Sequence, residues 1–330
     1  MPYNIVIAAN EGYVQHAAVM LCSLFETNRN KQFDIYLLTD GITDTSENRL
    51  QEMCHKYSSR LIVKQPETEL GKSLGINLKD LPVGQWHTMM YYKLFMPVML
   101  PPQCDRCLFL DVDMVINDDI QPLYDWDLQG NIIAAAEDIP DCNETHKPRL
   151  GMKLSDIYIN SGVMVCNLSA WRKKEAGAPI FEYVKKVSGN IMNEQDVIAM
   201  YFKGELTLLP IRWNMTTFYF MRVPKIFDKY LSLLPEAKCN PGIIHFAAPI
   251  KPWFKDCSHP YKGLYKKYLS MTEWKNFRFV NWEALTPRQR VNKIIKNFLN
   301  NIGVLKDPLY TPPIYDKYSL YHYSKSLVSR

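Results

Sequence analysis

The alternation of strand-like and helix-like segments over the first two thirds of the chain constrains the fold most strongly. Residues 5–9 and 33–39 are apolar runs typical of buried strands, and a third strand is predicted from residue 60. Between them, residues 13–26 place apolar side chains at helical spacing, and a second helix is predicted to end near Tyr57. Strands that alternate with helices build parallel sheets. We therefore predict an α/β fold with a mostly parallel central sheet.

The alternation continues beyond this point, with a less regular stretch at residues 66–87. The glycines and prolines of that stretch predict a loop with short helical pieces. Later strands are predicted over residues 107–110, 132–136, 158–166 and 206–209, and later helices over residues 90–100, 170–187 and 194–202.

The charge of the chain is concentrated at its C-terminal end. The 330 residues contain 39 basic and 34 acidic side chains, for a formal net charge of +5. Residues 281–330 hold eight basic and three acidic side chains, so they carry the whole excess, and residues 1–280 are neutral. This distribution argues against a nucleic-acid-binding protein. It predicts a body over residues 1–280 and a basic, aromatic C-terminal extension over residues 281–330.

The chain lacks the sequence features of export. Residues 1–10 enter a strand-like run without a basic region, a long apolar stretch and a small-residue cleavage site, and no apolar run approaches the ~18 residues of a membrane span. A cytoplasmic location is therefore expected. In that reducing compartment, the eight cysteines are expected to be free thiols.

An Asp-x-Asp sequence follows the apolar strand predicted over residues 107–110. In an extended segment Asp111 and Asp113 point to the same side, while Val112 points away. Ligands gather at the carboxyl ends of parallel strands, where this pair is expected. A divalent cation relieves the repulsion between two neighbouring carboxylates, and oxygen ligands favour Mg²⁺ or Mn²⁺, which commonly bring phosphate oxygens. A solvated turn at the strand end is the alternative.

The same run, LFLDVDMV, also fits the strand and Asp-x-Asp pattern of aspartyl-phosphate hydrolases. In that interpretation Asp111 is a nucleophile and Asp113 a general acid and base. Three βα elements are predicted to precede the motif, whereas such hydrolases normally begin their domain near it. This counts against the phosphohydrolase without excluding it.

Four further segments combine polar groups with small residues at the ends of predicted elements. Residues 8–13 place Asn10 and Tyr13 after a strand, where they suit a flat base. Residues 160–162 interrupt an apolar strand with an amide and a glycine, and residues 193–196 open a helix. Residues 245–253 combine His245, Lys251 between two prolines and Trp253. Histidine can join a metal, and lysine can meet phosphate.

Together, these segments resemble glycosyltransferase family 8, a family of retaining enzymes that includes bacterial lipopolysaccharide and lipooligosaccharide glucosyl- and galactosyltransferases and the glycogenins. The resemblance covers roughly residues 3–275. It rests on the order of short motifs: IVIAAN, MYYKLFMP, LFLDVDM, AAAED, YINSGVMVCNL, NEQDV and HFAAPIKPW. It implies a GT-A type nucleotide-sugar-binding fold, a UDP-hexose donor, and Mn²⁺ or Mg²⁺ as cofactor.

The resemblance also implies roles for individual residues. Asp111, Asp113 and His245 would bind the metal. Asn10 and Tyr13 would lie at the uridine, and Lys251 would neutralise the diphosphate. The donor sugar would be held at Asp138, Asn160, Glu194 and Gln195, and further donor-binding positions are Ala8, Lys93, Val112 and Ala248.

Gln195 would lie near the anomeric carbon of the donor. Its amide oxygen is a poor nucleophile, which favours front-face transfer over a covalent intermediate, with Asp138 and Glu194 as sugar-positioning acceptors. Three positions depart from the family pattern: Lys93 stands where arginine is usual, Glu194 where aspartate is usual, and Ala248 where glycine is usual. They keep open a third possibility, a non-catalytic nucleotide-sugar binder.

The sequence after Pro287 predicts a basic amphipathic helix. One side carries Arg288, Arg290, Lys293 and Lys296. The apolar side repeats at helical spacing, with Val291, Ile294, Ile295, Phe298, Leu299 and Ile302. One interpretation is an ordinary helix packed on the body. The other is that residues 285–330 dock peripherally on the anionic inner face of the cell membrane, where lipid-linked acceptors are built.

Overall fold

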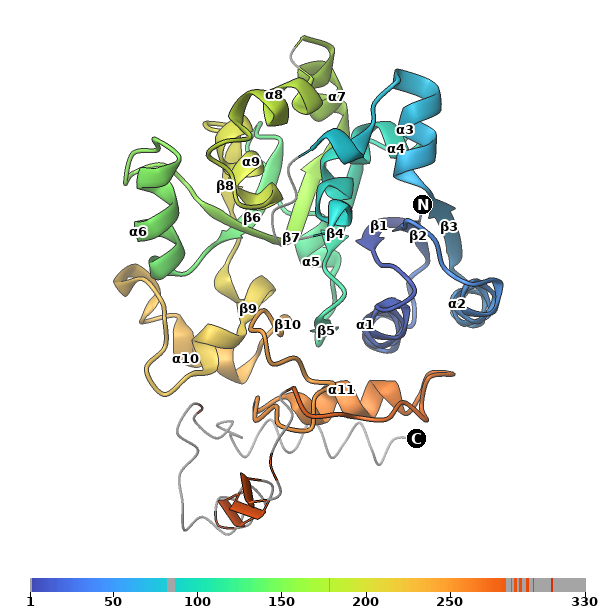
Figure 1. The fold of residues 1–330 in the computed structure, drawn as a ribbon, viewed down its shortest axis with the longest axis vertical. Coiled ribbons are helices and arrows are strands. Elements are labelled where there is room, and N and C mark those ends of the chain that lie inside the picture. The colour runs from blue at the N-terminus through green and yellow to red at the C-terminus, as the bar shows by residue number, and fades with distance from the viewer. Residues whose placement is uncertain are drawn as a thin grey trace.

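The chain folds around a central seven-stranded sheet in this computed structural model (Figure 1). The structure describes residues 2–81, 87–177 and 179–282, and further single positions: 286, 288, 289, 291, 292, 295, 296, 299 and 310. The strands are β1 (Tyr3–Ala8), β2 (Phe33–Leu38), β3 (Arg60–Lys64), β4 (Arg106–Leu110), β5 (Met114–Ile116), β6 (Ile133–Glu137), β7 (Ile159–Asn167), β8 (Leu206–Leu208), β9 (Met215–Thr216) and β10 (Ile243–His245).

The large sheet has the order β3-β2-β1-β4-β7-β6-β8. Four of its six neighbouring pairs are parallel, and β7 pairs antiparallel with both β4 and β6. The predicted α/β architecture with a mostly parallel sheet is therefore confirmed. Strands β5, β10 and β9 form a second, three-stranded sheet.

Helices cover both faces of the large sheet. The α-helices are α1 (Val14–Thr27), α2 (Asp44–Lys56), α3 (Pro66–Leu74), α4 (Met96–Met99), α5 (Gln121–Tyr124), α6 (Pro140–Arg149), α7 (Leu168–Gly177), α8 (Ile180–Val187), α9 (Glu194–Tyr201), α10 (Leu234–Cys239) and α11 (Lys262–Leu269). Short 3₁₀ helices are η1 (Leu78–Asp80), η2 (Thr88–Phe95), η3 (Ile211–Asn214), η4 (Thr217–Phe220) and η5 (Asp228–Tyr230).

The period-two alternation of the strands separates two apolar layers. On β1, Ile5 and Ile7 face the layer that contains α1 and α2, whereas Val6 faces the layer that contains η2, α4, α7, α8 and α9. Figure 1 shows the second group of helices on one side of the sheet and α1, α2 and α11 on the other. Burial on both faces explains why these strands are continuous apolar runs.

Two predicted helices are interrupted, and proline explains both interruptions. The helix predicted over residues 90–100 is the 3₁₀ helix η2 followed by the four-residue α4, because Pro97 has no N–H and is tolerated only in the first turn of an α-helix. The helix predicted over residues 170–187 is divided into α7 and α8 at Pro179. The stretch at residues 66–87 is more regular than predicted, since it contains the nine-residue α3.

The C-terminal extension is described at single positions. Arg288, Val291, Ile295, Lys296 and Leu299 have helical conformation. Other named members of the predicted basic helix lie outside the described residues: Arg290, Lys293, Ile294, Phe298 and Ile302. Among the described helices, none has both the length and the apolar character needed to cross a bilayer. All eight cysteines are free thiols, as predicted.

Candidate functional site

The smaller sheet brings His245 to the two aspartates. Asp111 and Asp113 lie in the short connection between β4 and β5, and His245 is the last residue of β10. Strand β10 pairs antiparallel with β5, so His245 lies in register with Met114, the residue after Asp113. The aspartates therefore lie in a bend after β4, although an extended segment was predicted. They still face the same side, while Val112 packs in the apolar layer beside α1.

The three side chains converge and could hold a metal ion, and they are called the metal-ligand set below. One ligand atom from each of Asp111, Asp113 and His245 lies within 4.8 Å of the others. The Nε2 atom of His245 is 3.3 Å from an Asp113 oxygen and 4.0 Å from an Asp111 oxygen. Two carboxylates and an imidazole form a donor set that suits Mn²⁺ or Mg²⁺. These residues therefore fit the predicted metal.

Gly162 of β7 leaves space for the side chains of this site because it has no side chain of its own. A Cβ atom at this position would lie 2.6 Å from Cε1 of His245 and 2.9 Å from Oδ2 of Asp111. Any other residue would thus push into two of the three ligands. The glycine is needed here for space and not for backbone conformation.

The two aspartates have different electrostatic surroundings. Burial raises the pKa of Asp111, an effect that the Lys93 ammonium opposes and the Asp113 carboxylate reinforces. Burial also favours the neutral form of Asp113, but Lys251 and His245 outweigh it and hold the pKa of Asp113 well below its usual range. Asp113 is therefore the more strongly stabilised anion of the pair.

Two lysines contact the aspartates: Lys251, from the segment after β10, and Lys93, from η2. The Lys251 ammonium is 2.6 Å from an Asp113 oxygen and donates to the carbonyl of Phe246 at 2.8 Å. The Lys93 ammonium lies 3.2 Å from Asp111 and 2.9 Å from Glu194. Burial opposes its charge, but these carboxylates together raise the pKa of Lys93. Lys93 thus joins the metal-ligand set to the N-terminus of α9.

The first residues of α9 are fixed by β7 and by the end of β6. The Gln195 amide oxygen accepts from the backbone N–H of Ser161 at 3.0 Å, and its nitrogen donates to Asp138 at 2.7 Å. The Ser161 hydroxyl donates to Glu194 at 3.1 Å. Burial raises the pKa of Asp138, against the hydrogen bonds that it accepts. These contacts hold Gln195 in one orientation.

Asn10 lies at the end of β1 with an unsatisfied polar atom. Its Oδ1 is buried and has no hydrogen-bond partner among the described residues. Such an atom is costly unless a ligand satisfies it. Tyr13 is 46% exposed and meets Trp253 edge-to-face at 5.8 Å. Ala8 and Ala248 are half-buried, Ala8 at the end of β1 and Ala248 in the segment after β10.

Two residues near the site were missed by the sequence analysis. His16 stacks on Trp253 with ring centroids 3.6 Å apart, and it is hydrogen-bonded to the Tyr265 hydroxyl at 2.7 Å. His16 follows Tyr13 by three residues, and on a helix this spacing could have predicted that the two side chains are neighbours. Asn214 contacts both His245 and Asn160, at 2.9 and 2.8 Å. No pattern in the sequence marks Asn214 as part of a site.

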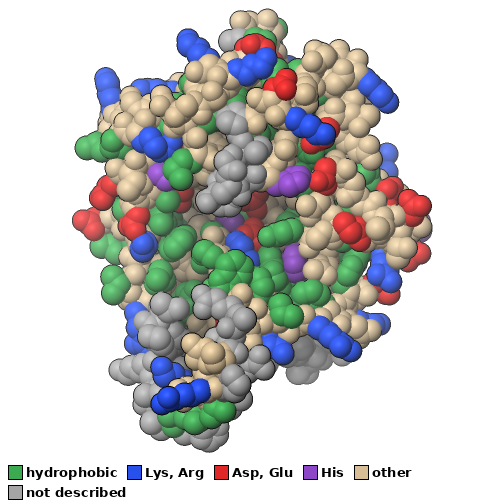
Figure 2. All heavy atoms as spheres, viewed as in Figure 1, with side chains coloured by type: hydrophobic (Ala, Val, Ile, Leu, Met, Phe, Trp, Pro, Cys, Tyr) green, Lys and Arg blue, Asp and Glu red, His purple; other side chains and the backbone are tan. Residues whose placement is uncertain are grey.

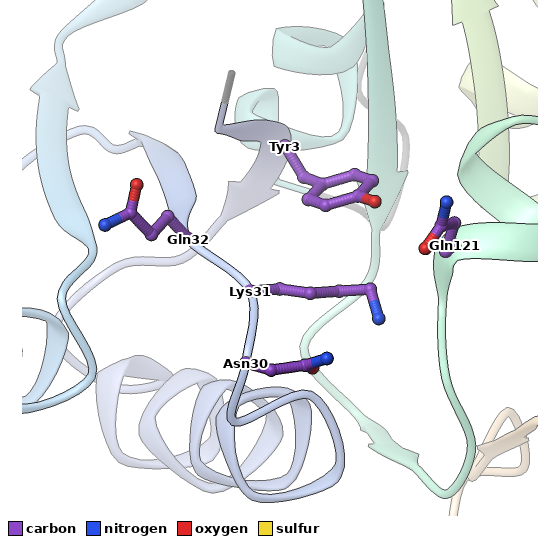
Figure 3. A pocket seen from close by; sticks show the side chains of 5 residues that line it. All are labelled: Tyr3, Asn30, Lys31, Gln32 and Gln121. Carbon is purple, nitrogen blue, oxygen red and sulfur yellow. The ribbon is translucent and has the colours of Figure 1, made fainter.

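One face of the molecule is hollowed. Figure 2 shows a hollow near the centre of one face, with acidic and histidine side chains in its depth, a basic side chain beside it and hydrophobic side chains below. A different depression, lined by Tyr3, Lys31 and Gln121 among others, lies at the opposite end of β1 (Figure 3). None of the described residues that line it is a predicted donor-binding residue.

Comparisons with known proteins identify a glycosyltransferase family. The profile described as glycosyl transferase family 8 matches residues 4–257. General stress protein A of Bacillus subtilis is 25% identical, with 82% of this chain and 94% of that protein covered. Lipopolysaccharide 1,2-glucosyltransferase of Escherichia coli K12 is 27% identical, with 83% of this chain and 79% of that protein covered.

Solved structures give the same result for the fold. The galactosyltransferase LgtC, crystallised with donor and acceptor sugar analogues, superposes with a TM-score of 0.66 at 20% identity, covering 87% of this chain and 99% of that chain. The predicted GT-A type fold and the predicted resemblance to a glycosyltransferase family are therefore confirmed. Because the family profile spans most of the chain, this protein belongs to glycosyl transferase family 8.

Proposed function

We propose that this glycosyltransferase moves a hexose from a UDP-sugar to a hydroxyl of a glycan or glycolipid, with retention of anomeric configuration and with Mn²⁺ or Mg²⁺ as cofactor. One observation carries the proposal: Asp111, Asp113 and His245, far apart in the sequence, converge as a metal-ligand set beside Lys251. The named lipopolysaccharide glycosyltransferases among the relatives support a hexose donor.

The metal would be held by Asp111, Asp113 and His245. When bound, it supplies a Lewis acid that stabilises negative charge on the diphosphate. Lys251 supplies a second positive charge from the protein itself. Its ammonium is held by Asp113 and by the Phe246 carbonyl, so it is positioned before the donor arrives.

The donor nucleoside would lie over the end of β1. The unsatisfied Asn10 oxygen offers an acceptor to the N–H of a uracil ring. Tyr13 offers an aromatic ring that is 46% exposed. Both features support binding of a flat base at this edge of the sheet.

The sugar would lie between the two aspartates and the N-terminus of α9. Glu194 is paired with Lys93, and Asp138 accepts from Gln195, so both carboxylates are engaged as fixed acceptors. In front-face transfer the bond from the anomeric carbon to the UDP oxygen breaks while the acceptor oxygen bonds on the same face. The acceptor proton passes to the departing diphosphate. The Gln195 oxygen would stabilise the positive charge that develops on the anomeric carbon.

The proposal is tested by donor turnover. The purified protein is incubated with a panel of UDP-sugars and Mn²⁺, and UDP release is measured with and without candidate glycan acceptors. We expect UDP release from at least one UDP-hexose, and a loss of roughly 10²-fold or more in the Asp113→Asn variant. Binding of UDP-sugars without any UDP release would support the non-catalytic binder instead.

The phosphohydrolase interpretation is tested in the same preparation. It requires phosphate release from a phosphomonoester, with Asp111 as the nucleophile. The family match to glycosyltransferases favours UDP release. Phosphate release that depends on Asp111, without UDP release, would contradict the proposed function.

We further propose that the body at residues 1–280 acts in the cytoplasm and that residues 281–330 dock on an anionic membrane surface. Val291 and Ile295 are 55% and 50% exposed, so these two members of the apolar face are available to a membrane. Arg288 and Lys296 are also exposed. A basic side chain contributes about 1 kcal/mol near such a surface.

The double variant Arg288→Gln/Lys296→Gln should therefore weaken binding to phosphatidylglycerol vesicles roughly 30-fold in a sedimentation assay. The matched control, Lys72→Gln/Lys79→Gln, removes two exposed lysines from the body and should change the binding little. Equal binding by both double variants would contradict membrane docking through this extension.

A further inference from the structure

Asn214 lies directly behind His245 and has no role in the proposed transfer. It ends η3, and its side chain is fully buried. Its Oδ1 is 2.9 Å from Nδ1 of His245, and its Nδ2 donates to Oδ1 of Asn160 at 2.8 Å. The amide thus bridges the predicted metal ligand and a residue predicted to hold the donor sugar.

A backbone group fixes the direction of this bridge. The N–H of Gly162, which can only donate, donates to Oδ1 of Asn160 at 3.1 Å. The Asn160 oxygen is therefore the acceptor, and the Asn214 group that faces it must be the amide nitrogen. The Asn214 oxygen is then left to face His245. An oxygen acceptor at 2.9 Å requires the hydrogen of the imidazole to be on Nδ1.

This hydrogen position determines what His245 presents to the aspartates. With the hydrogen on Nδ1, the neutral ring turns the lone pair of Nε2 toward Asp113 at 3.3 Å and Asp111 at 4.0 Å. A lone pair and two carboxylates can all donate electron pairs to a metal ion, so this arrangement suits a cation bound by all three side chains. Ligating histidines are commonly oriented through their second ring nitrogen.

We infer that Asn214 is a positioning residue that holds His245 in the tautomer whose Nε2 lone pair faces Asp111 and Asp113. This inference rests on the proposed metal-dependent function. Asn214 is not part of the sequence motifs. Its hydrogen bond to Asn160 also connects it to a residue predicted to hold the donor sugar. Asn160 also bonds Asp138, so one chain of hydrogen bonds runs from His245 to the side chains predicted to hold the donor sugar.

The first experiment measures the tautomer without any metal. Protein labelled with ¹⁵N-histidine is examined by long-range ¹H–¹⁵N NMR at alkaline pH, where an imidazole is ordinarily neutral. The His245 signal is assigned by its absence in His245→Gln. We expect the hydrogen on Nδ1 and an unprotonated Nε2. A hydrogen on Nε2 would overturn the inference, and this result needs no folded variant of Asn214.

The second experiment compares two replacements of Asn214 by Mn²⁺ titration in the presence of UDP. Asn214→Leu keeps the branched shape but removes the acceptor, so Mn²⁺ affinity should fall roughly 10- to 100-fold and the Nδ1 hydrogen should no longer be held. Asn214→Asp keeps an acceptor opposite Nδ1 but loses the N–H that Asn160 accepts, so its tautomer should be preserved and its Mn²⁺ affinity should fall less than in Asn214→Leu. An equal loss of affinity in both variants would overturn the inference.

A matched control separates positioning from general destabilisation. Asn28 is also buried, at 1% exposure, and it bonds Leu24 and Ile120 at the far end of α1. Asn28→Leu should lower thermal stability without changing Mn²⁺ affinity. If the wild-type protein does not bind Mn²⁺ at all, the proposed function fails, whereas the NMR measurement still decides the inference about Asn214.

Discussion

Lys93 shows how a single buried charge can organise the site. Its side chain is 5% exposed, yet its ammonium contacts Asp111 and Glu194 and lies over the Phe109 ring. Taking this charge out of water is costly, and the two carboxylates offset that cost. The residue therefore holds the metal-ligand set and the start of α9 at a fixed separation.

Replacing Lys93 by methionine should weaken both stability and catalysis. The change keeps a long apolar stem but leaves the partly buried carboxylates of Asp111 and Glu194 without their cation. The free energy of unfolding should fall by about 3–5 kcal/mol in urea denaturation. UDP release from the UDP-hexose substrate should fall roughly 10²-fold.

Lys93→Arg is the control for that change, since it keeps the charge and supplies two arms for the two carboxylates. It should retain more activity and stability than Lys93→Met. Equal activity in wild type and Lys93→Met would show that the pairing with Asp111 and Glu194 has no part in transfer.

At the scale of elements, β7 controls the space in the site through one residue. Gly162→Ala would place a methyl group 2.6 Å from Cε1 of His245 and 2.9 Å from Oδ2 of Asp111, so these side chains must shift. We expect Mn²⁺ affinity to fall at least 10-fold in a calorimetric titration. The overpacking should lower the free energy of unfolding by about 1–3 kcal/mol.

Gly263→Ala provides the matched control, because a Cβ atom at Gly263 meets nothing within 4 Å and the residue lies in α11. This change should stabilise the protein by about 0.5–1 kcal/mol and leave Mn²⁺ affinity unchanged. Unchanged affinity in Gly162→Ala as well would contradict the assignment of the metal to this place.

The elements also show what could be predicted from the sequence. Local patterns predicted β1, α1, β2 and β4 because the spacing of apolar residues and the turn-forming residues between them determine these elements. The same patterns missed the breaks at Pro97 and Pro179, where apolar spacing continues through a residue that cannot continue the helix. At both places the proline, and not the apolar spacing, determines where the helix ends.

Only the site residues that belong to short sequence motifs could be predicted. Asp111, Asp113, His245 and Lys251 stand in such motifs, and the structure brings them together. Asn214 does not, because its role comes from the pairing of β10 with β9 and β5, which no local pattern reveals. His16 could be predicted in part. The sequence shows its helical spacing from Tyr13, but it does not show that His16 stacks on Trp253.

At the scale of the whole molecule, buried histidines link stability to pH. His259 is 4% exposed and is surrounded by the aromatic rings of Phe220, Phe246, Tyr261 and Tyr310. Burial lowers the pKa of His259 from the ordinary 6.5 to about 3. Burial also lowers the pKa of His16 to about 3, an effect that Asp113 opposes and Lys251 reinforces.

Between pH 6.5 and about 3, the unfolded chain binds protons at these histidines that the folded chain does not. The free energy of unfolding should therefore fall as the pH is lowered through this window. His259→Phe should show a shallower decrease, measured by urea denaturation at several pH values. A decrease as steep as that of the wild type would show that His259 does not stay neutral in the folded protein.

The central claim concerns the whole site, and binding of UDP tests it most directly. Isothermal titration of the wild-type protein with UDP should be done once with Mn²⁺ and once with EDTA. If Asp111, Asp113 and His245 hold a cation that meets the diphosphate, UDP should bind at least 10-fold more tightly with Mn²⁺, and His245→Gln should lose that gain. Equal UDP affinity with Mn²⁺ and with EDTA would contradict the account.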